Sequence, residues 1–129
     1  MNVASILSRG GPGFAAAQCG TVQTTLAGGS GQKGDMFNVI NLTAGPMTIT
    51  GFDQAFFAAG TCTFEIYTKV GTWQGFENIG SIASWTLVGS TAGLVHGGGG
   101  TAIPVPIPVS IVIPPGGTQA MYLTTTNAT

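Results

Sequence analysis

Residues 49–75, which read ITGFDQAFFAAGTCTFEIYTKVGTWQG, decide the fold of this 129-residue chain. From residue 61 onward two sets of side chains alternate, and a period of two predicts an extended strand with one face in a core and the other in solvent. The predicted core face carries Cys62, Phe64, Ile66, Thr68 and Val70. Glu65, Tyr67 and Lys69 share the predicted solvent face. In the strand before it, Gly51 predicts a β-bulge.

Residues 103–115, IPVPIPVSIVIPP, predict an edge strand. The odd positions from 103 to 113 are all β-branched, which is typical of a strand with one buried face. Pro104, Pro106 and Pro108 lie between them and lack the N–H group that a neighbouring strand would need. Because alternate residues of a strand point their main-chain groups to opposite sides, the prolines block one side only. We therefore expect residues 103–109 to pair on one side and to stay unpaired on the other.

Glycine and proline interrupt the chain so often that helices are nearly excluded. The longest window without either residue is the twelve residues 118–129. Further strands are predicted over residues 21–27, 35–42, 85–88 and 119–126, with Gly- and Pro-containing turns between them. This spacing predicts an all-β protein, a single antiparallel β-sandwich of the jelly-roll or immunoglobulin-like kind. Residues 1–20 are expected to precede it as an extended arm, and residues 21–129 to form the sandwich domain.

The composition limits the partners. Charged residues make up 5% of the chain, against about 25% in a typical protein. Arg9, Lys33 and Lys69 are the only cationic side chains besides the single histidine, too few to follow a phosphate backbone, so nucleic-acid binding is not expected. A formal net charge of −1 lowers the repulsion between copies and suits a protein that packs against itself or a lattice.

The first twenty residues, MNVASILSRGGPGFAAAQCG, contain Gly-Gly-Pro-Gly where an export signal would have a continuous apolar run. Neither a signal peptide nor a membrane-inserted segment is therefore predicted. The arm offers apolar side chains for contacts with other subunits, namely Val3, Ile6, Leu7 and Phe14. Cys19 in the arm and Cys62 in the central strand leave two alternatives open, a disulfide in an oxidising environment or a buried free thiol at Cys62.

No catalytic, metal or cofactor motif is recognised. Gly29, Gly31 and Gly34 have the G-x-G-x-x-G spacing of a pyrophosphate loop, but a predicted strand follows them instead of the required helix. His96 is the single histidine and is expected to be solvated. The four carboxylates are scattered along the sequence. The chain is thus predicted not to be an enzyme and to need no cofactor.

Two weaker patterns concern carbohydrate. Four aromatic side chains could form a platform on which sugar rings stack, with the alternative that the two tryptophans close the ends of the core: Tyr67, Trp73, Phe76 and Trp85. Asn41 and Asn127 each begin a glycosylation sequon, which matters only in a chain exported through a glycosylating pathway.

Four segments, PMTITGFD, TCTFEIYTKVGTW, SWTLVGSTAG and IPPGGTQAMYLTTTN, resemble a pattern that recurs in bacterial secreted and cell-surface β-sandwich domains. The pattern consists of I-T-G-F-D, an E-x-Y-x-K-x-G strand, W-T-L-V-G, and I-P-x-G before an aromatic strand that ends in threonine. The resemblance covers residues 34–126 and implies a non-enzymatic surface module without assigned site residues. Two departures from the pattern are expected: no export signal is predicted over the first twenty residues, and domains with this pattern usually continue beyond the strand that ends in threonine.

These observations together predict a non-enzymatic structural protein that works as a subunit of a larger assembly. A virion capsid decoration or minor capsid protein, at the virion surface, is the first expectation. A subunit of an extracellular fibre or a cell-surface layer is the alternative location, and a carbohydrate-binding surface module is the alternative function. The expected partners are copies of the same chain or a capsid or surface lattice, with glycan in the third case.

Overall fold

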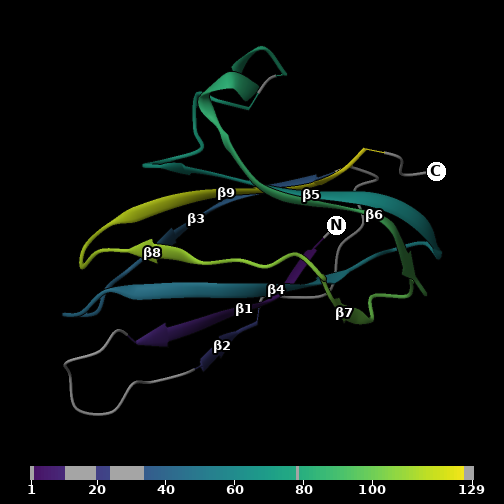
Figure 1. Cartoon of the computed structure of the whole chain (residues 1–129), viewed down its shortest axis with the longest axis horizontal. Coiled ribbons are helices and arrows are strands. Elements are labelled where there is room, and N and C mark those ends of the chain that lie inside the picture. Colours follow the sequence, from purple (N-terminus) through teal and green to yellow (C-terminus); the bar gives the residue numbers. More distant parts are fainter. Residues whose placement is uncertain (1, 11–19, 24–33, 78, 127–129) are drawn as a thin grey trace.

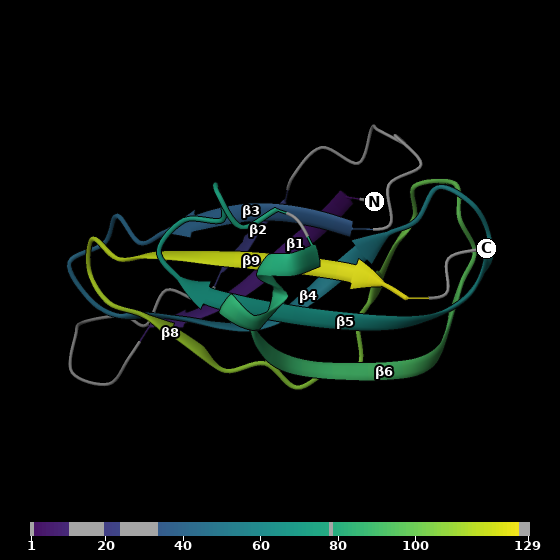
Figure 2. The same ribbon diagram turned by 90° about the horizontal axis from the view of Figure 1, so that it is seen from above.

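The computed structural model describes residues 2–10, 20–23, 34–77 and 79–126 and shows two antiparallel sheets packed face to face (Figure 1). Sheet A has the order β2-β1-β4-β7, with β8 also on β4: β1 (Asn2–Gly10), β2 (Gly20–Val22), β4 (Met47–Ala55), β7 (Ala102–Pro104) and β8 (Ile111–Ile113). Sheet B has the order β3-β9-β5-β6, visible in Figure 2: β3 (Gly34–Ile40), β5 (Gly60–Val70), β6 (Thr86–His96) and β9 (Thr118–Thr125). A short 3-10 helix, η1 (Ile79–Ser84), lies between β5 and β6. The predicted all-β antiparallel sandwich is confirmed.

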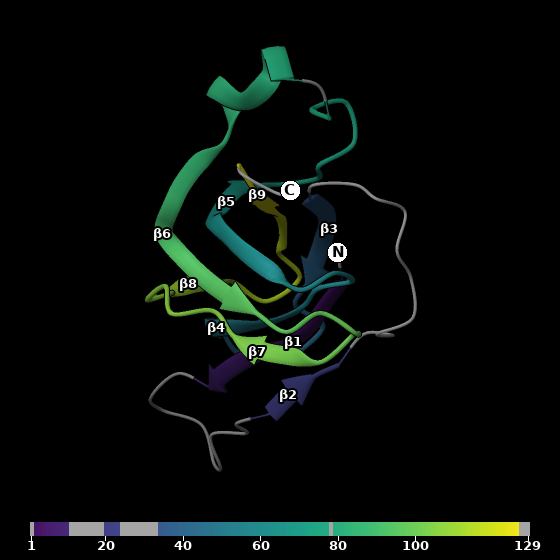
Figure 3. The same cartoon turned by 90° about the vertical axis from the view of Figure 1, so that its right-hand side faces the viewer.

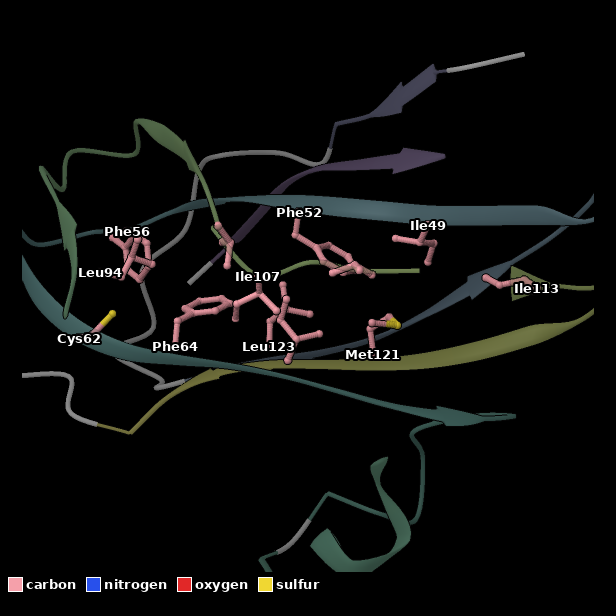
Figure 4. Packing of buried hydrophobic residues seen from close by; sticks show 13 residues of the cluster. Ile49, Phe52, Phe56, Cys62, Phe64, Leu94, Ile107, Ile113, Met121 and Leu123 are labelled. Atoms are coloured by element: carbon pink, nitrogen blue, oxygen red, sulfur yellow. The ribbon is translucent and has the colours of Figure 1, made fainter. Parts of the chain in front are cut away.

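The core lies between the two sheets (Figure 4). It is built from inward side chains of β4, β5, β6, β8 and β9, together with Phe56 just after β4 and the segment between β7 and β8: Ile49, Phe52, Phe56, Cys62, Phe64, Ile66, Leu94, Val105, Ile107, Val109, Ile113, Met121 and Leu123. Cys62 is 2% exposed and shares the core face of β5, as its strand pattern predicts.

The prediction for the end of β5 was wrong, because Val70 is 82% exposed. Val70 is the last residue of the strand and pairs with Gln119, just before the turn at Gly71. A period of two identifies the face on which a side chain lies. It does not say where the opposite sheet ends. A side chain is buried only if it lies on the inward face and the opposite sheet covers it.

Residues 102–113 run along one edge of sheet A, where both β7 and β8 pair with β4. Val105, Ile107 and Val109 are buried, while the three prolines between and before them are exposed, as the alternation predicts. No strand of the described residues pairs on the other side of this segment. The edge position and the buried face are thus confirmed.

The segment is, however, not one continuous strand. Pro104 lies opposite Asp53 and Ile111 opposite Ile49, so seven steps along the edge face four steps on β4 and three residues are extra. The Ile107 N–H donates to the Val105 carbonyl at 2.8 Å, a three-residue turn with Pro106 at its centre. The fixed φ of proline, near −65°, suits this turn and explains why the expected strand is broken into β7 and β8.

The opposite edge of β4 pairs with β1, which the sequence places in the arm. The register of this pair shifts where Leu7 faces Gly51 and Ser8 faces Ile49, so Thr50 is the extra residue of a bulge. The bulge expected near Gly51 is therefore present. β2 pairs with β1 over three residue pairs. Residues 11–19 and 24–27 of the predicted arm and first strand lie outside the described residues.

Candidate functional site on the outer face of sheet B

The outer face of sheet B carries a cluster of aromatic side chains that the sequence placed only in part. Tyr67 of β5 lies directly opposite Tyr122 of β9, and their rings stack at 5.8 Å between centroids with 26° between planes. The Trp85 ring contacts Tyr122 at 5.9 Å in a tilted arrangement. Both tyrosines are half-buried, whereas Trp85 is 7% exposed. We call Tyr67, Trp85 and Tyr122 the aromatic cluster.

The segment between β5 and β6, described over residues 71–77 and 79–85, rises from sheet B (Figure 1) and ends at Trp85 of this cluster. Asn38 of β3 holds it from one side. The Asn38 amide donates to Thr72 Oγ1 at 3.1 Å and to Gln74 Oε1 at 3.3 Å, and its carbonyl oxygen accepts the Trp73 N–H at 3.1 Å. One amide side chain therefore fixes the start of the segment through three hydrogen bonds.

The far part of the segment is held by its aromatic residues. The Lys69 ammonium lies 3.9 Å from the centroid of the Phe76 ring, a cation–π contact. The Trp85 indole N–H donates to the Phe76 carbonyl at 3.3 Å. Because the indole is covered and hydrogen-bonded, Trp85 acts as an anchor for this segment.

The four residues of the predicted sugar platform are therefore only partly brought together. Tyr67 and Trp85 both contact Tyr122, and Phe76 is linked to Trp85 through its carbonyl. Trp73 joins the site through its main-chain hydrogen bond to Asn38. No ring contact between Trp73 and the cluster is found among the described residues. Whether the exposed parts of Tyr67, Trp73 and Phe76 bind a ligand stays a prediction.

Tyr122 is the member that sequence reasoning missed. The alternation in QAMYLTTT places it on the face opposite Met121 and Leu123, which was the available signal. Gly34 is the first residue of β3, and a Cβ built there would lie 2.7 Å from Tyr122 Cε2. The absence of a side chain at Gly34 is what allows the Tyr122 ring to lean over β3.

The hydroxyl groups of the cluster are engaged within the sheet. Tyr67 donates to Glu65 Oε2 at 2.9 Å, and Tyr122 donates to Thr124 Oγ1 at 3.2 Å. Burial, followed by the hydrogen bond and the charge of Glu65, raises the pKa of Tyr67 above its ordinary value of 10.0. The tyrosine stays protonated at neutral pH, so the cluster offers stacking surface and hydrogen bonds rather than proton transfer.

Histidine, cysteine and acidic side chains do not gather in the part of the chain that the structure describes, where no three of them form a metal-binding group. His96, expected to be solvated, is half-buried at the end of β6. Its ring stacks on Phe56 at 3.9 Å, and its Nδ1 lies 2.9 Å from the Ala58 carbonyl oxygen. Through these contacts His96, the last residue of β6, packs against the turn between β4 and β5. Gly34 opens a strand, and Gly29 and Gly31 lie outside the described residues.

Asn41 is part of the fold and not an accessible sequon. It is fully buried, and its amide donates to the carbonyls of Gly45 at 2.8 Å and Ile113 at 2.9 Å. Its side-chain oxygen accepts the Thr43 N–H and hydroxyl at 2.9 and 2.7 Å. All of its polar atoms are thus occupied in bracing the turn that follows β3. Asn127 lies outside the described residues.

The thiol and arm residues can be located only in part. Burial raises the pKa of the Cys62 thiol above 9.0, which keeps it protonated. Cys19 lies outside the described residues, so its pairing with Cys62 stays a prediction. Val3, Ile6 and Leu7 belong to β1, while Phe14 lies outside the described residues.

Comparison of the chain with protein-family models, with curated proteins and with solved structures finds no match. Among the described residues, no helix has the length and apolar character needed to cross a membrane. The structure thus defines a class, a two-sheet antiparallel β-sandwich whose N-terminal strand β1 lies between β2 and β4, and its function has to be inferred from its own surface.

Proposed function

We propose that this chain is a non-enzymatic structural protein that packs as a subunit of a larger protein assembly, and in the first place a virion capsid decoration or minor capsid protein. The observation that carries the proposal is β1. An N-terminal strand is attached to the edge of β4 by main-chain pairing along Asn2–Gly10, and within the described residues it makes its other strand contact only with β2. This pairing lies within one chain, and the same pairing between chains, in which a strand of one copy adds to a sheet edge of another, is a common way in which proteins bind each other.

The surface supports the same proposal. Large apolar side chains are exposed at several places on the sandwich: Leu42, Phe57, Val70, Leu87, Val95 and Val112. The chain has only 5% charged residues to keep copies apart. A weakly charged surface with exposed apolar side chains favours contacts with other protein surfaces. Copies of this chain, or a capsid or surface lattice, are the partners that fit.

The sequence resemblance to bacterial secreted and cell-surface sandwich domains supports the alternative location, a fibre or cell-surface layer outside the cell. Both locations use the same physical property, a small sandwich with little charge that packs into a lattice. The proposed subunit role is therefore the same in both locations, and the virion is the location proposed first.

One observation favours carbohydrate binding as a second candidate function. The half-buried stack of Tyr67 on Tyr122, with Glu65 within hydrogen-bonding distance of Tyr67, combines aromatic faces with a carboxylate, as sugar sites do. The burial of Trp85 leaves less stacking surface than the sequence suggested. This is why the assembly role ranks higher.

The test compares the full-length chain with a variant lacking residues 1–20 by size-exclusion chromatography with light scattering. The proposal expects the full-length chain to form oligomers. It expects the truncated chain to lose the larger oligomers or to precipitate, because the edge of β4 loses its partner strand. Ser110→Ala, a change at an exposed polar position, is the control and should behave as the full-length chain does. If full-length and truncated chains both run as the same well-behaved monomer, the assembly role is contradicted.

A further inference from the structure

β3 is an edge strand with an unbroken pairing register. It forms one edge of sheet B and pairs with β9 through seven consecutive residues, from Gly34 opposite Thr124 to Ile40 opposite Thr118, without a shift. No strand of the described residues pairs with its other side. The strand contains no proline, and Asp35 is its only charged residue. It therefore has few of the devices that usually block an edge.

The direction of the main-chain groups shows which residues point outward. Asn41 donates its N–H to the Gly117 carbonyl at 3.0 Å and accepts the Gly116 N–H at 2.8 Å, so its main chain points toward the β9 side. Because these directions alternate along a strand, Phe37 and Val39 also point to β9. The N–H and C=O groups of Met36, Asn38 and Ile40 then point away from the sheet and can pair with another strand.

We propose that β3 pairs with β3 of a second copy, antiparallel and about a two-fold axis near Phe37, so that the two sheets B become one continuous sheet. In this register Ile40 lies opposite Gly34 of the second copy, and Met36 lies opposite Asn38. The contact is isologous and closes on itself, as a two-fold dimer requires. The β3 pairing deepens the proposed function, because it names the partner and the surface. It rests on that function in one respect, namely that copies of the chain associate.

Side-chain size supports this register. Ile40 is 54% exposed and is the large apolar side chain that β3 leaves open to solvent. Gly34, its partner in the pairing, has no side chain, and the space beside it is bounded by the Tyr122 ring. Because the Tyr122 ring already lies over Gly34, Ile40 of one copy would contact that ring in the other copy. Such pairs of a β-branched and an aromatic residue stabilise neighbouring strands.

The distribution of charge supports the same register. Asp35 lies opposite Val39 of the second copy, so the two Asp35 carboxylates are separated along the strands. A register centred on Asp35 would instead place the two carboxylates directly opposite each other, and like charges in that position are destabilising. A second copy therefore fits this edge without introducing a like-charge contact.

The test is sedimentation velocity over a concentration series of the full chain, of Ile40→Lys and of Leu42→Ser. The wild type should form dimers whose fraction rises with concentration. Ile40→Lys places a charge on the edge, the usual protection against strand pairing, and should weaken the dimer by about tenfold or more. Leu42→Ser removes an exposed apolar side chain just beyond the strand and should leave the dimer unchanged. Circular dichroism checks that each variant is folded. Ile40→Lys should fold because Ile40 is 54% exposed, so the lysine is not buried in the monomer.

The outcomes separate the two proposals. If the wild type assembles and Ile40→Lys assembles equally well, pairing through β3 is overturned while the subunit role stands. If the wild type stays monomeric at every concentration, pairing between copies through β3 is overturned as well. If this edge is occupied by a segment of the same chain outside the described residues, Ile40→Lys destabilises the monomer without changing its association, which also overturns the proposal.

Discussion

β3 and β6 are the two edges of the same sheet, yet they differ in how well they can accept another strand. β3 pairs with β9 through seven residues without a shift. β6 pairs with β5 in a register that shifts twice, between Cys62 and Phe64 and between Ile66 and Tyr67. At the shift between Cys62 and Phe64, Gly93 of β6 has a φ of 71°. This is the left-handed conformation that glycine adopts in one common type of β-bulge. Bulges turn an edge away from a flat partner, so β6 is protected where β3 is not.

The surroundings of the two strands increase the difference. β6 lies on the same side of the sandwich as the proline-containing edge of sheet A (Figure 3). A Cβ built at Gly89 of β6 would lie 2.6 Å from Ile107 Cγ2, so the two sheets are in close contact there. One side of the sandwich therefore combines bulges and prolines, and the other carries the edge that can pair. The comparison shows that only one of the two edges of sheet B is interrupted by bulges.

The largest effect is expected at the protected side. Ile107→Ala removes a side chain that is 5% exposed and that fills the space between the two sheets beside β6. Loss of a buried isoleucine leaves a cavity and should lower the free energy of unfolding by about 2–5 kcal/mol. Val112→Ala, at an exposed position of β8, should change it by less than about 0.5 kcal/mol. Urea titrations of both variants measure the difference, and equal losses would show that residues 105–110 are not part of the core.

A smaller effect with a defined pH dependence is expected at β3. Burial raises the pKa of Asp35 above its ordinary value of 3.8, and its Oδ2 atom has no hydrogen-bond partner among the described residues. The folded state thus holds the Asp35 proton more tightly than the unfolded state does. This residue destabilises the fold least below pH 3.8, and its unfavourable effect grows as the pH rises through the raised pKa.

Asp35→Asn should therefore increase the free energy of unfolding at neutral pH, and its advantage over the wild type should shrink as the pH is lowered toward 3.8. Glu77→Gln, at an exposed loop position, makes the same change in net charge and should show no such trend. Urea midpoints at several pH values provide the measurement. An advantage of Asp35→Asn that does not vary with pH would contradict the role given to burial.

The sequence predicted those features that depend on the alternation of side chains along one strand. It located β5 with Cys62 on the core face, the inward face of residues 103–113, and the position of that segment at the edge of a sheet. It failed where a neighbouring element decides the outcome. Val70 is exposed because the core ends before it, and Pro106 forms a turn that breaks the expected strand.

The candidate site shows the same limit. Period two placed Tyr67 on the outer face, but contacts with Tyr122 and Gly34 depend on strand order, which a single sequence does not reveal. His96 is held by Phe56 across the turn between strands, and Asn41 is satisfied by carbonyls as distant in sequence as Ile113. These residues acquire their roles from long-range pairing, and no local pattern marks them.

Hydrogen exchange of the β3 main-chain amides in the assembled protein tests the difference between the two edges most directly. Phe37 and Val39 donate toward β9 and should be protected in monomer and assembly alike. The outward amides of Met36, Asn38 and Ile40 should exchange rapidly in dilute monomer and become protected on assembly, while outward amides of β6 continue to exchange. If the outward amides of β3 exchange as fast in the assembled protein as in the monomer, β3 is not the pairing edge and the account is contradicted.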